Sequence, residues 1–168
     1  MSRDVANRFN HQMGDTLVPP EAKIQESTMY VPGTDGEKMS KSKGNIIDIF
    51  LADKQLRKQI MKIKTDSTPM EDPKNPDTCN LFGLYKLVAN EAQIEEMRVN
   101  YVGGNYGYGH AKQAFYELLI ENFKTEREKY HYYMEHLEEV DQILKKGAQK
   151  AHLVADAVLK RVREKLGY

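Results

Sequence analysis

The opening of the chain combines one amphipathic segment with stretches that have no apolar periodicity. Val5, Phe9 and Met13 lie four residues apart and precede Gly14, and this spacing predicts a helix that ends at the glycine. Residues 23–31 are short, mixed in character and compatible with one strand. The segment after them has no apolar repeat and is predicted to be a mobile loop.

Helical spacing returns in the middle of the chain. Leu56, Ile60 and Ile63 mark the apolar face of one predicted helix. Residues 66–78 contain three prolines and several turn formers, so we expect a connecting loop there. Residues 79–89 are predicted to form the next helix.

A capped helix is predicted after that. Asn90 followed three residues later by Gln93 is typical of a helix start in which each side chain bonds the other's backbone, and we expect this helix to end near Asn100. The glycine-rich run 103–109 does not have the Gly-x-Gly-x-x-Gly spacing, and no strand precedes it. We therefore interpret it as a turn.

The last third is predicted to contain three helices. The first is long and spans about residues 110–136, and the second spans 137–146 and is stopped by Gly147. The third spans 148–166, where four apolar residues recur at four-residue steps. The residues on that face are Val154, Val158, Val162 and Leu166.

The predicted elements give a mainly α fold with an irregular opening third. One helix, one possible strand and a loop cannot bury both faces of a sheet. We therefore expect the opening third to be the tail of a larger α/β domain that lies upstream, and the remainder to be a helical bundle.

Composition narrows the class of protein. The 168 residues are 40% hydrophobic and 30% charged with a net charge of zero, which is typical of a soluble protein with a real core. No run approaches the roughly 18 apolar residues of a membrane span, and residues 1–10 are too polar for a secretory signal. Cys79 is the single cysteine, so no internal disulfide is possible. We expect a reducing, cytoplasmic location.

Charge is segregated along the chain. Residues 38–64 hold eight Lys/Arg and two Asp/Glu, and residues 66–97 hold two Lys/Arg and seven Asp/Glu. Residues 145–165 are basic again, with seven Lys/Arg and two Asp/Glu. Charge alone leaves two interpretations open: ordinary solvated helix faces, or a local phosphate-binding surface on a neutral body.

The chemically informative segment is the loop 36–45. Lys38 and Lys41 are three residues apart, and the hydroxyls of Ser40 and Ser42 are interleaved with them. Ammonium groups combined with hydroxyl and backbone donors suit a polyphosphate, on which charge grows during transfer. The Gly-x-x-x-x-Gly-Lys-Ser/Thr spacing of a Walker loop is missing.

A helix is expected to begin directly after this loop. Asn45 followed by Asp48 resembles a helix cap, and a helix start there adds the positive end of a dipole to the phosphate site.

The five residues from Lys38 to Ser42 match, letter for letter, the Lys-Met-Ser-Lys-Ser loop of class I aminoacyl-tRNA synthetases. A chance match in a chain of this length is on the order of one in 10⁴ at ordinary amino-acid usage. The chain is further similar to the tryptophanyl members of this class, in order and spacing, over five other segments. These are residues 3–10, 62–67, 101–111, 126–134 and 147–151.

This resemblance implies a domain organisation and a set of site residues. Residues 1–52 would be the tail of a Rossmann-like catalytic domain, and residues 53–168 a helical domain that recognises the tRNA anticodon. Lys38 and Lys41 would hold the ATP phosphates, with Lys41 stabilising the pyrophosphate leaving group. The other ATP-binding residues implied are Met39, Ser40 and Ser42 in the loop and Met29, or Thr28, upstream against adenine.

The resemblance also implies a reaction and its partners. The tryptophan carboxylate attacks the α-phosphate of ATP, with Mg²⁺ screening charge, and a ribose hydroxyl of tRNA(Trp) then takes the tryptophanyl group. No side-chain nucleophile is expected, and neither a tightly bound cofactor nor a structural metal is predicted. The family is homodimeric, and we expect its dimer contacts and most of the tryptophan pocket to lie outside this chain.

One limit and two alternatives follow. The His-Ile-Gly-His-type signature of the class is not in this sequence, so the isolated chain is predicted to be inactive. A tyrosyl synthetase fragment shares the architecture and is the first alternative. The second is a helical protein-interaction module with a phosphorylatable Ser40–Ser42 loop. Tyr130 and Tyr133 are tempting as base-stacking side chains, but their spacing favours a place in the core or a helix seam.

Overall fold

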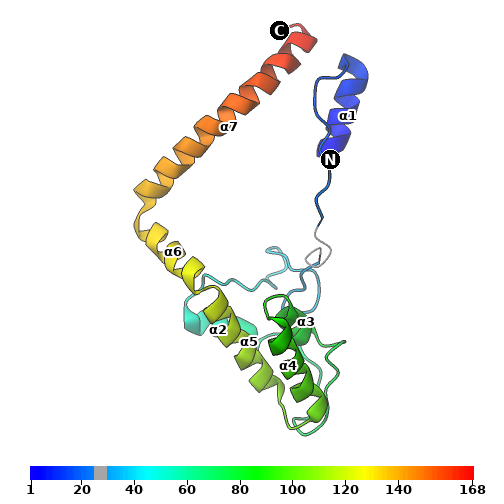
Figure 1. Cartoon of the computed structure of the whole chain (residues 1–168), viewed down its shortest axis with the longest axis vertical. Coiled ribbons are helices and arrows are strands. Elements are labelled where there is room, and N and C mark those ends of the chain that lie inside the picture. Colours follow the sequence, from blue (N-terminus) through cyan, green and yellow to red (C-terminus); the bar gives the residue numbers. More distant parts are fainter. Residues whose placement is uncertain (25–29) are drawn as a thin grey trace. The chain divides into compact units, whose positions relative to one another are not determined.

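The computed structural model describes residues 1–24 and 30–168, and within these ranges it is mainly α, as predicted (Figure 1). The only β pairing among them is an isolated antiparallel bridge between Pro32 and Lys38. Most of the strand predicted over residues 23–31 lies outside the described residues. The helices are α1 Ser2–Met13, α2 Asp53–Met61, α3 Asn80–Lys86, α4 Glu91–Gly103, α5 Tyr108–Asn122, α6 Lys124–Glu135 and α7 Leu137–Leu166.

The chain divides into two compact units. One unit spans Gln25–His131, and the other combines Met1–Ile24 with Tyr132–Tyr168. The domain boundary expected between residues 52 and 53 stays a prediction.

The larger unit contains the hydrophobic core. Helix α5 packs against α2 and α3, and α3 also packs against α4. Leu56 and Ile60 on α2 and Tyr101 on α4 are fully buried, and burying a side chain of this size stabilises a fold by about 1.5–3 kcal/mol. The predicted apolar face of Leu56, Ile60 and Ile63 therefore belongs to the core. The core consists of Leu56, Ile60, Ile63, Leu81, Phe82, Leu84, Tyr85, Met97, Tyr101, Ala111, Phe115, Leu118 and Leu119.

The predicted cap of α4 is confirmed. The side chain of Asn90 accepts from the Gln93 backbone N–H at 2.9 Å, and the Gln93 side chain accepts from the Asn90 backbone N–H at 2.9 Å. The helix continues to Gly103, three residues beyond the expected end. Gly104 then adopts a φ of 72°, which ends the helix and opens the predicted turn.

The prediction of one long helix over residues 110–136 is wrong. The chain leaves the helical path at Phe123, whose φ is −105°, and this residue separates α5 from α6. The break follows from tertiary packing, because Phe123 packs against the core of the larger unit.

The predicted stop at Gly147 is also wrong. Helix α7 runs without a break from Leu137 to Leu166, and it ends at Gly167 in a left-handed conformation. A glycine inside a helix costs about 1 kcal/mol relative to alanine, and here good helix formers on both sides offset that cost. Of the four residues predicted on one apolar face, Val158 and Val162 are partly buried, as is Val140 near the start of the helix.

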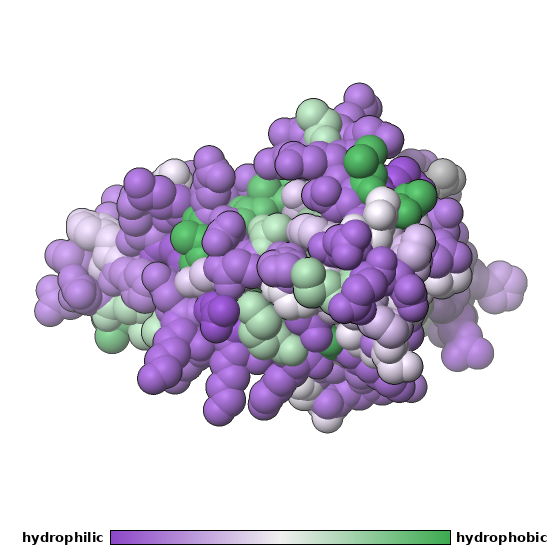
Figure 2. All heavy atoms as spheres, turned by 90° about the horizontal axis from the view of Figure 1, so that it is seen from below, coloured by the Kyte–Doolittle hydropathy of each residue, from purple (hydrophilic) through white to green (hydrophobic). Residues whose placement is uncertain are grey.

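The surface is mostly polar. Figure 2 shows one face on which hydrophilic side chains dominate and hydrophobic ones form small separate patches. No helix in ranges 1–24 and 30–168 is long and apolar enough to span a membrane.

Candidate functional site

The lysine-serine loop begins with a short hairpin-like turn. The Met39 N–H donates to the Val31 carbonyl at 2.9 Å, and the Gly33 N–H donates to the Glu37 carbonyl at 2.6 Å. The Gly36 N–H closes the turn on the Gly33 carbonyl at 3.0 Å. These bonds hold the backbone on both sides of Lys38.

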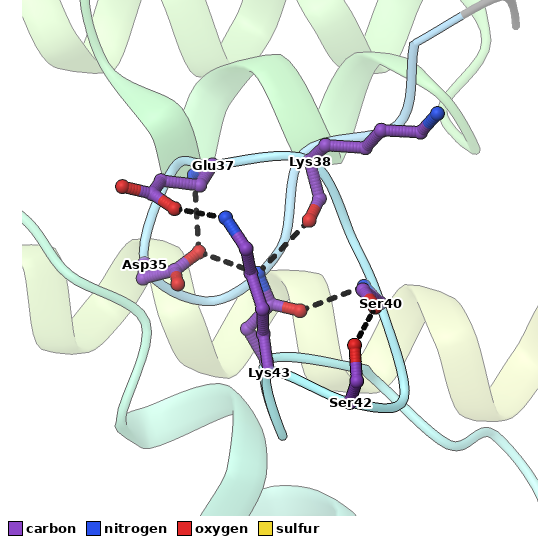
Figure 3. Close-up of polar contacts among 7 residues, drawn as sticks. Asp35, Glu37, Lys38, Ser40, Ser42 and Lys43 are labelled. Atoms are coloured by element: carbon purple, nitrogen blue, oxygen red, sulfur yellow. Dashed lines mark hydrogen bonds and ion pairs between the residues drawn. The ribbon is translucent and has the colours of Figure 1, made fainter.

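A second turn follows at the centre of the motif. The Gly44 N–H donates to the Lys41 carbonyl at 3.1 Å, and Gly44 has a φ of 67°, which glycine adopts without steric cost. The hydroxyls of Ser40 and Ser42 lie 2.8 Å apart and share a hydrogen bond (Figure 3). The motif is therefore a pair of hydrogen-bonded turns, with no helix in it.

The three lysines of the loop differ in their surroundings. Lys43 donates to the Glu37 carboxylate, and this bond raises the pKa of Lys43. The side chains of Lys38 and Lys41 are exposed, and neither ammonium is bonded to a residue in the described part of the chain. The Lys38 side chain points away from the other labelled side chains in Figure 3. Two positive charges are therefore available for an anionic ligand.

The expected helix start at Asn45 and Asp48 is wrong, because residues 45–52 are not helical and α2 begins at Asp53. The Asp48 side chain accepts from the Phe50 backbone N–H at 3.0 Å, in a turn. Asn45 turns back into the loop instead. Its side chain bonds Asp35, the Lys38 carbonyl and the Ser40 N–H.

The sequence analysis missed Asp35 and the role of Asn45 in the loop, although it named Lys38 and Ser40. Asn45 is 3% exposed, and its hydrogen bond is the largest cause that lowers the pKa of Asp35. The sequence offered one signal, because asparagine and aspartate at loop ends readily hydrogen-bond nearby backbone. That signal fits a helix cap and a loop contact equally well.

The base of the loop is fixed to the helical body of the same unit. The Asn80 side chain donates to the Gly33 carbonyl at 3.0 Å, and the Lys64 N–H donates to the Thr34 carbonyl at 2.7 Å. Both donors lie beyond α2 in the sequence, so the position of the loop depends on the packing of the helical core.

The segment after the loop is held by a buried arginine. Arg127 on α6 is 8% exposed, and its guanidinium donates to the carbonyls of Ile49 and Leu51, the latter at 3.0 Å. It also pairs with the Asp53 carboxylate, while the ring of Phe50 stacks on Tyr130 with centroids 4.6 Å apart. Helix α6 thereby clamps the residues that link the loop to α2.

The two tyrosines expected in the core or a helix seam are not in the core. Tyr130 and Tyr133 are 39% and 37% exposed. Tyr130 covers only one face of its ring with Phe50, so part of the aromatic surface faces solvent.

Two other expectations concerned the residues against adenine and a metal site. Met29 and Thr28, expected against adenine, lie outside the described residues. Over ranges 1–24 and 30–168, no group of three or more His, Cys, Asp or Glu side chains gathers as a metal site would require. Cys79 is half-buried, with its Sγ 3.7 Å from the Tyr101 hydroxyl.

The chain is similar to known proteins over most of its length. The family model described as tRNA synthetases class I (W and Y) matches residues 1–124. Tryptophan–tRNA ligases of Campylobacter jejuni and Rhodopirellula baltica are 42% and 46% identical to the chain over 99% and 98% of its length. The chain spans about half of these relatives, 52% in each case.

A solved structure agrees with the sequence comparison. The crystal structure of the tryptophanyl-tRNA synthetase from Campylobacter jejuni, complexed with ADP and tryptophan, matches 99% of the chain with a TM-score of 0.84 and 43% identity. The match covers 52% of that protein.

Proposed function

The chain belongs to the family of class I tRNA synthetases for tryptophan and tyrosine, and from that premise we propose that it is the C-terminal half of a tryptophan–tRNA ligase. The observation that carries the proposal is the Lys38–Ser42 loop, which presents two exposed ammonium groups and a hydroxyl pair on one short segment.

The loop would act on the phosphates of ATP. Lys38 and Lys41 would bind the phosphate oxygens, and Lys41 would stabilise the charge that grows on pyrophosphate as the tryptophan carboxylate attacks the α-phosphate. The hydroxyls of Ser40 and Ser42 would add hydrogen bonds, and Met39, which is partly buried, would pack the loop against the body. Mg²⁺ would screen charge on the phosphates. The ADP and tryptophan in the Campylobacter jejuni structure support ATP and tryptophan as substrates.

The rest of the chain would serve tRNA(Trp). In this proposal residues 1–52 are the tail of a Rossmann-like catalytic domain and residues 53–168 recognise the anticodon. Exposed aromatic side chains such as Tyr130 and Tyr132 suit stacking on unpaired bases. The tryptophan pocket and the contacts of a homodimer would be supplied largely by the N-terminal half. The protein would act in the cytoplasm.

Tryptophan is favoured over tyrosine by the relatives, which are named tryptophan–tRNA ligases over nearly the whole chain. The same matches disfavour a protein-interaction module, because they extend through the loop and the helices in one continuous alignment.

The activity is tested in a hybrid enzyme, in which this chain replaces the matching part of the Campylobacter jejuni ligase. We expect the hybrid enzyme to catalyse ATP–pyrophosphate exchange with tryptophan and not with tyrosine, and we expect the 168-residue chain alone to be inactive. A hybrid enzyme that is folded but inactive, or that prefers tyrosine, would contradict the proposal.

The tRNA partner is tested on the chain itself. Binding of tRNA(Trp) should exceed binding of tRNA(Tyr), and it should weaken as salt rises because phosphate contacts release counterions. Equal binding of both tRNAs, or binding that does not change with salt, would contradict an anticodon-recognising role.

A further inference from the structure

The side chain of Asn45 makes three hydrogen bonds inside the loop, with both Nδ2 donors and with Oδ1. Its Oδ1 accepts from the Ser40 N–H at 2.8 Å. Its Nδ2 donates to the Lys38 carbonyl at 3.2 Å and to Asp35 Oδ1 at 2.8 Å. The backbone carbonyl of Asn45 accepts from the Thr34 N–H at 2.9 Å. A single amide therefore links the two turns of the loop.

Two of these bonds reach the backbone of the motif itself. They fix the carbonyl of Lys38 and the amide of Ser40, which lie on either side of Met39. The Ser40 N–H is thereby directed inward, and Lys41 follows it into the turn closed by Gly44. The backbone from which the Lys38 and Lys41 side chains extend is therefore held by contacts that involve neither ammonium.

An aspartate, which has a similar size, could not make the same hydrogen bonds at position 45. An aspartate would keep one acceptor but lose both donors, and it would place a carboxylate against the Lys38 carbonyl and Asp35. Gly33 leaves the space for the amide, because a Cβ there would lie 2.4 Å from the Asn45 side chain. The buried position of Asn45 explains why water cannot replace these bonds.

We propose that Asn45 is the positioning residue of the phosphate-binding loop: it holds the backbone of Lys38 and Ser40 so that both lysines reach the same polyphosphate. The inference rests on the proposed function of the loop in ATP binding. Asn45 itself touches no substrate in this account, and its effect passes through the two lysines.

The first test measures loop order in the 168-residue chain. Hydrogen exchange of the Ser40 amide should be about tenfold faster or more in Asn45→Ala than in the wild type, because its acceptor is removed. Asn90→Ala is the matched control. Its Oδ1 accepts a backbone N–H at 2.9 Å, in the cap of α4, so it removes a similar bond away from the loop. Unchanged exchange at Ser40 in Asn45→Ala would overturn the inference.

The second test measures ATP–pyrophosphate exchange in the hybrid enzyme. We expect Asn45→Ala and Asn45→Asp to lower kcat on the order of 100-fold, a loss expected when catalytic groups are displaced by about 1 Å. The KM for tryptophan should not change, and Asn90→Ala should keep wild-type kcat. Gly33→Ala should act like Asn45→Ala, since its Cβ displaces the amide.

A double-mutant cycle with Lys41→Ala separates positioning from general damage. If Asn45 acts through Lys41, the double variant should lose far less than the product of the two single losses. Independent, multiplying losses would overturn the inference.

The same measurements distinguish the inference from the proposal beneath it. A large loss in Lys41→Ala with none in Asn45→Ala would overturn only the positioning role. Full activity in Lys38→Ala and Lys41→Ala, or an inactive wild-type hybrid enzyme, would overturn the proposed function and the inference with it.

Discussion

Replacing Arg127 should destabilise the larger unit more than any exposed charge does. Arg127 is 8% exposed, and its guanidinium donates to the carbonyls of Ile49 and Leu51. Arg127→Ala removes the donor from both carbonyls and leaves the segment between the loop and α2 without its clamp.

The magnitude follows from the exposure of each partner. A hydrogen bond to a charged group contributes about 1.5–3 kcal/mol. Both carbonyls belong to half-buried residues, so we count about 1.5 kcal/mol for each of the two bonds. The Asp53 carboxylate is 68% exposed, so its pairing with Arg127 adds little. We expect the free energy of unfolding to fall by about 3 kcal/mol in Arg127→Ala.

Urea denaturation followed by circular dichroism measures this loss. With a slope of about 2 kcal/mol per molar urea, the midpoint should fall by about 1.5 M. Arg98→Ala is the control, because Arg98 also pairs with an aspartate, Asp77, which is 72% exposed. Arg98 is half-buried over the Phe82 ring, so its loss should cost about 1 kcal/mol from both contacts. Equal midpoint shifts for the two arginines would refute the assignment of Arg127 as a clamp.

Three further predictions concern the core, a turn and an ionised side chain. Leu56→Ala removes a fully buried side chain and should lower the free energy of unfolding by about 3 kcal/mol, measured by urea denaturation. Gly104→Ala combines a φ of 72° with a Cβ 2.5 Å from the Glu71 carbonyl, so its melting temperature should fall well below that of Gly109→Ala, where space is open. Hydrogen bonds from Thr68 hold the pKa of Asp66 below its usual value. The stabilisation from Asp66 should therefore be complete at neutral pH and be lost as pH falls through its lowered pKa. The destabilisation by Asp66→Asn should be largest at pH 7 and should shrink as pH falls below about 4.

The features predicted correctly from sequence depend on local interactions. The capped start at Asn90 needs only a partner three residues away, and the apolar face of Leu56 and Ile60 follows from helical spacing alone. The Lys38–Ser42 motif was recognisable because its residue types are informative without knowledge of the fold.

The features that were missed depend on contacts between segments. Asn45 has the residue type of a helix cap, and only the return of the chain toward Asp35 makes it a hydrogen-bonding centre of the loop. Phe123 breaks a periodic segment because it packs against the core, and Gly147 stays helical because its neighbours outweigh its own preference. Arg127 carries no sequence signal of burial, since its acceptors lie 76 and 78 residues upstream.

The most direct test of the central claim is the single-turnover rate of tryptophanyl-adenylate formation by the hybrid enzyme, with and without Lys41→Ala. The account predicts a loss on the order of 100-fold or more, as when one donor to developing charge is removed, with tryptophan affinity unchanged. Equal rates for the two proteins would contradict the assignment of this loop to the phosphates of ATP.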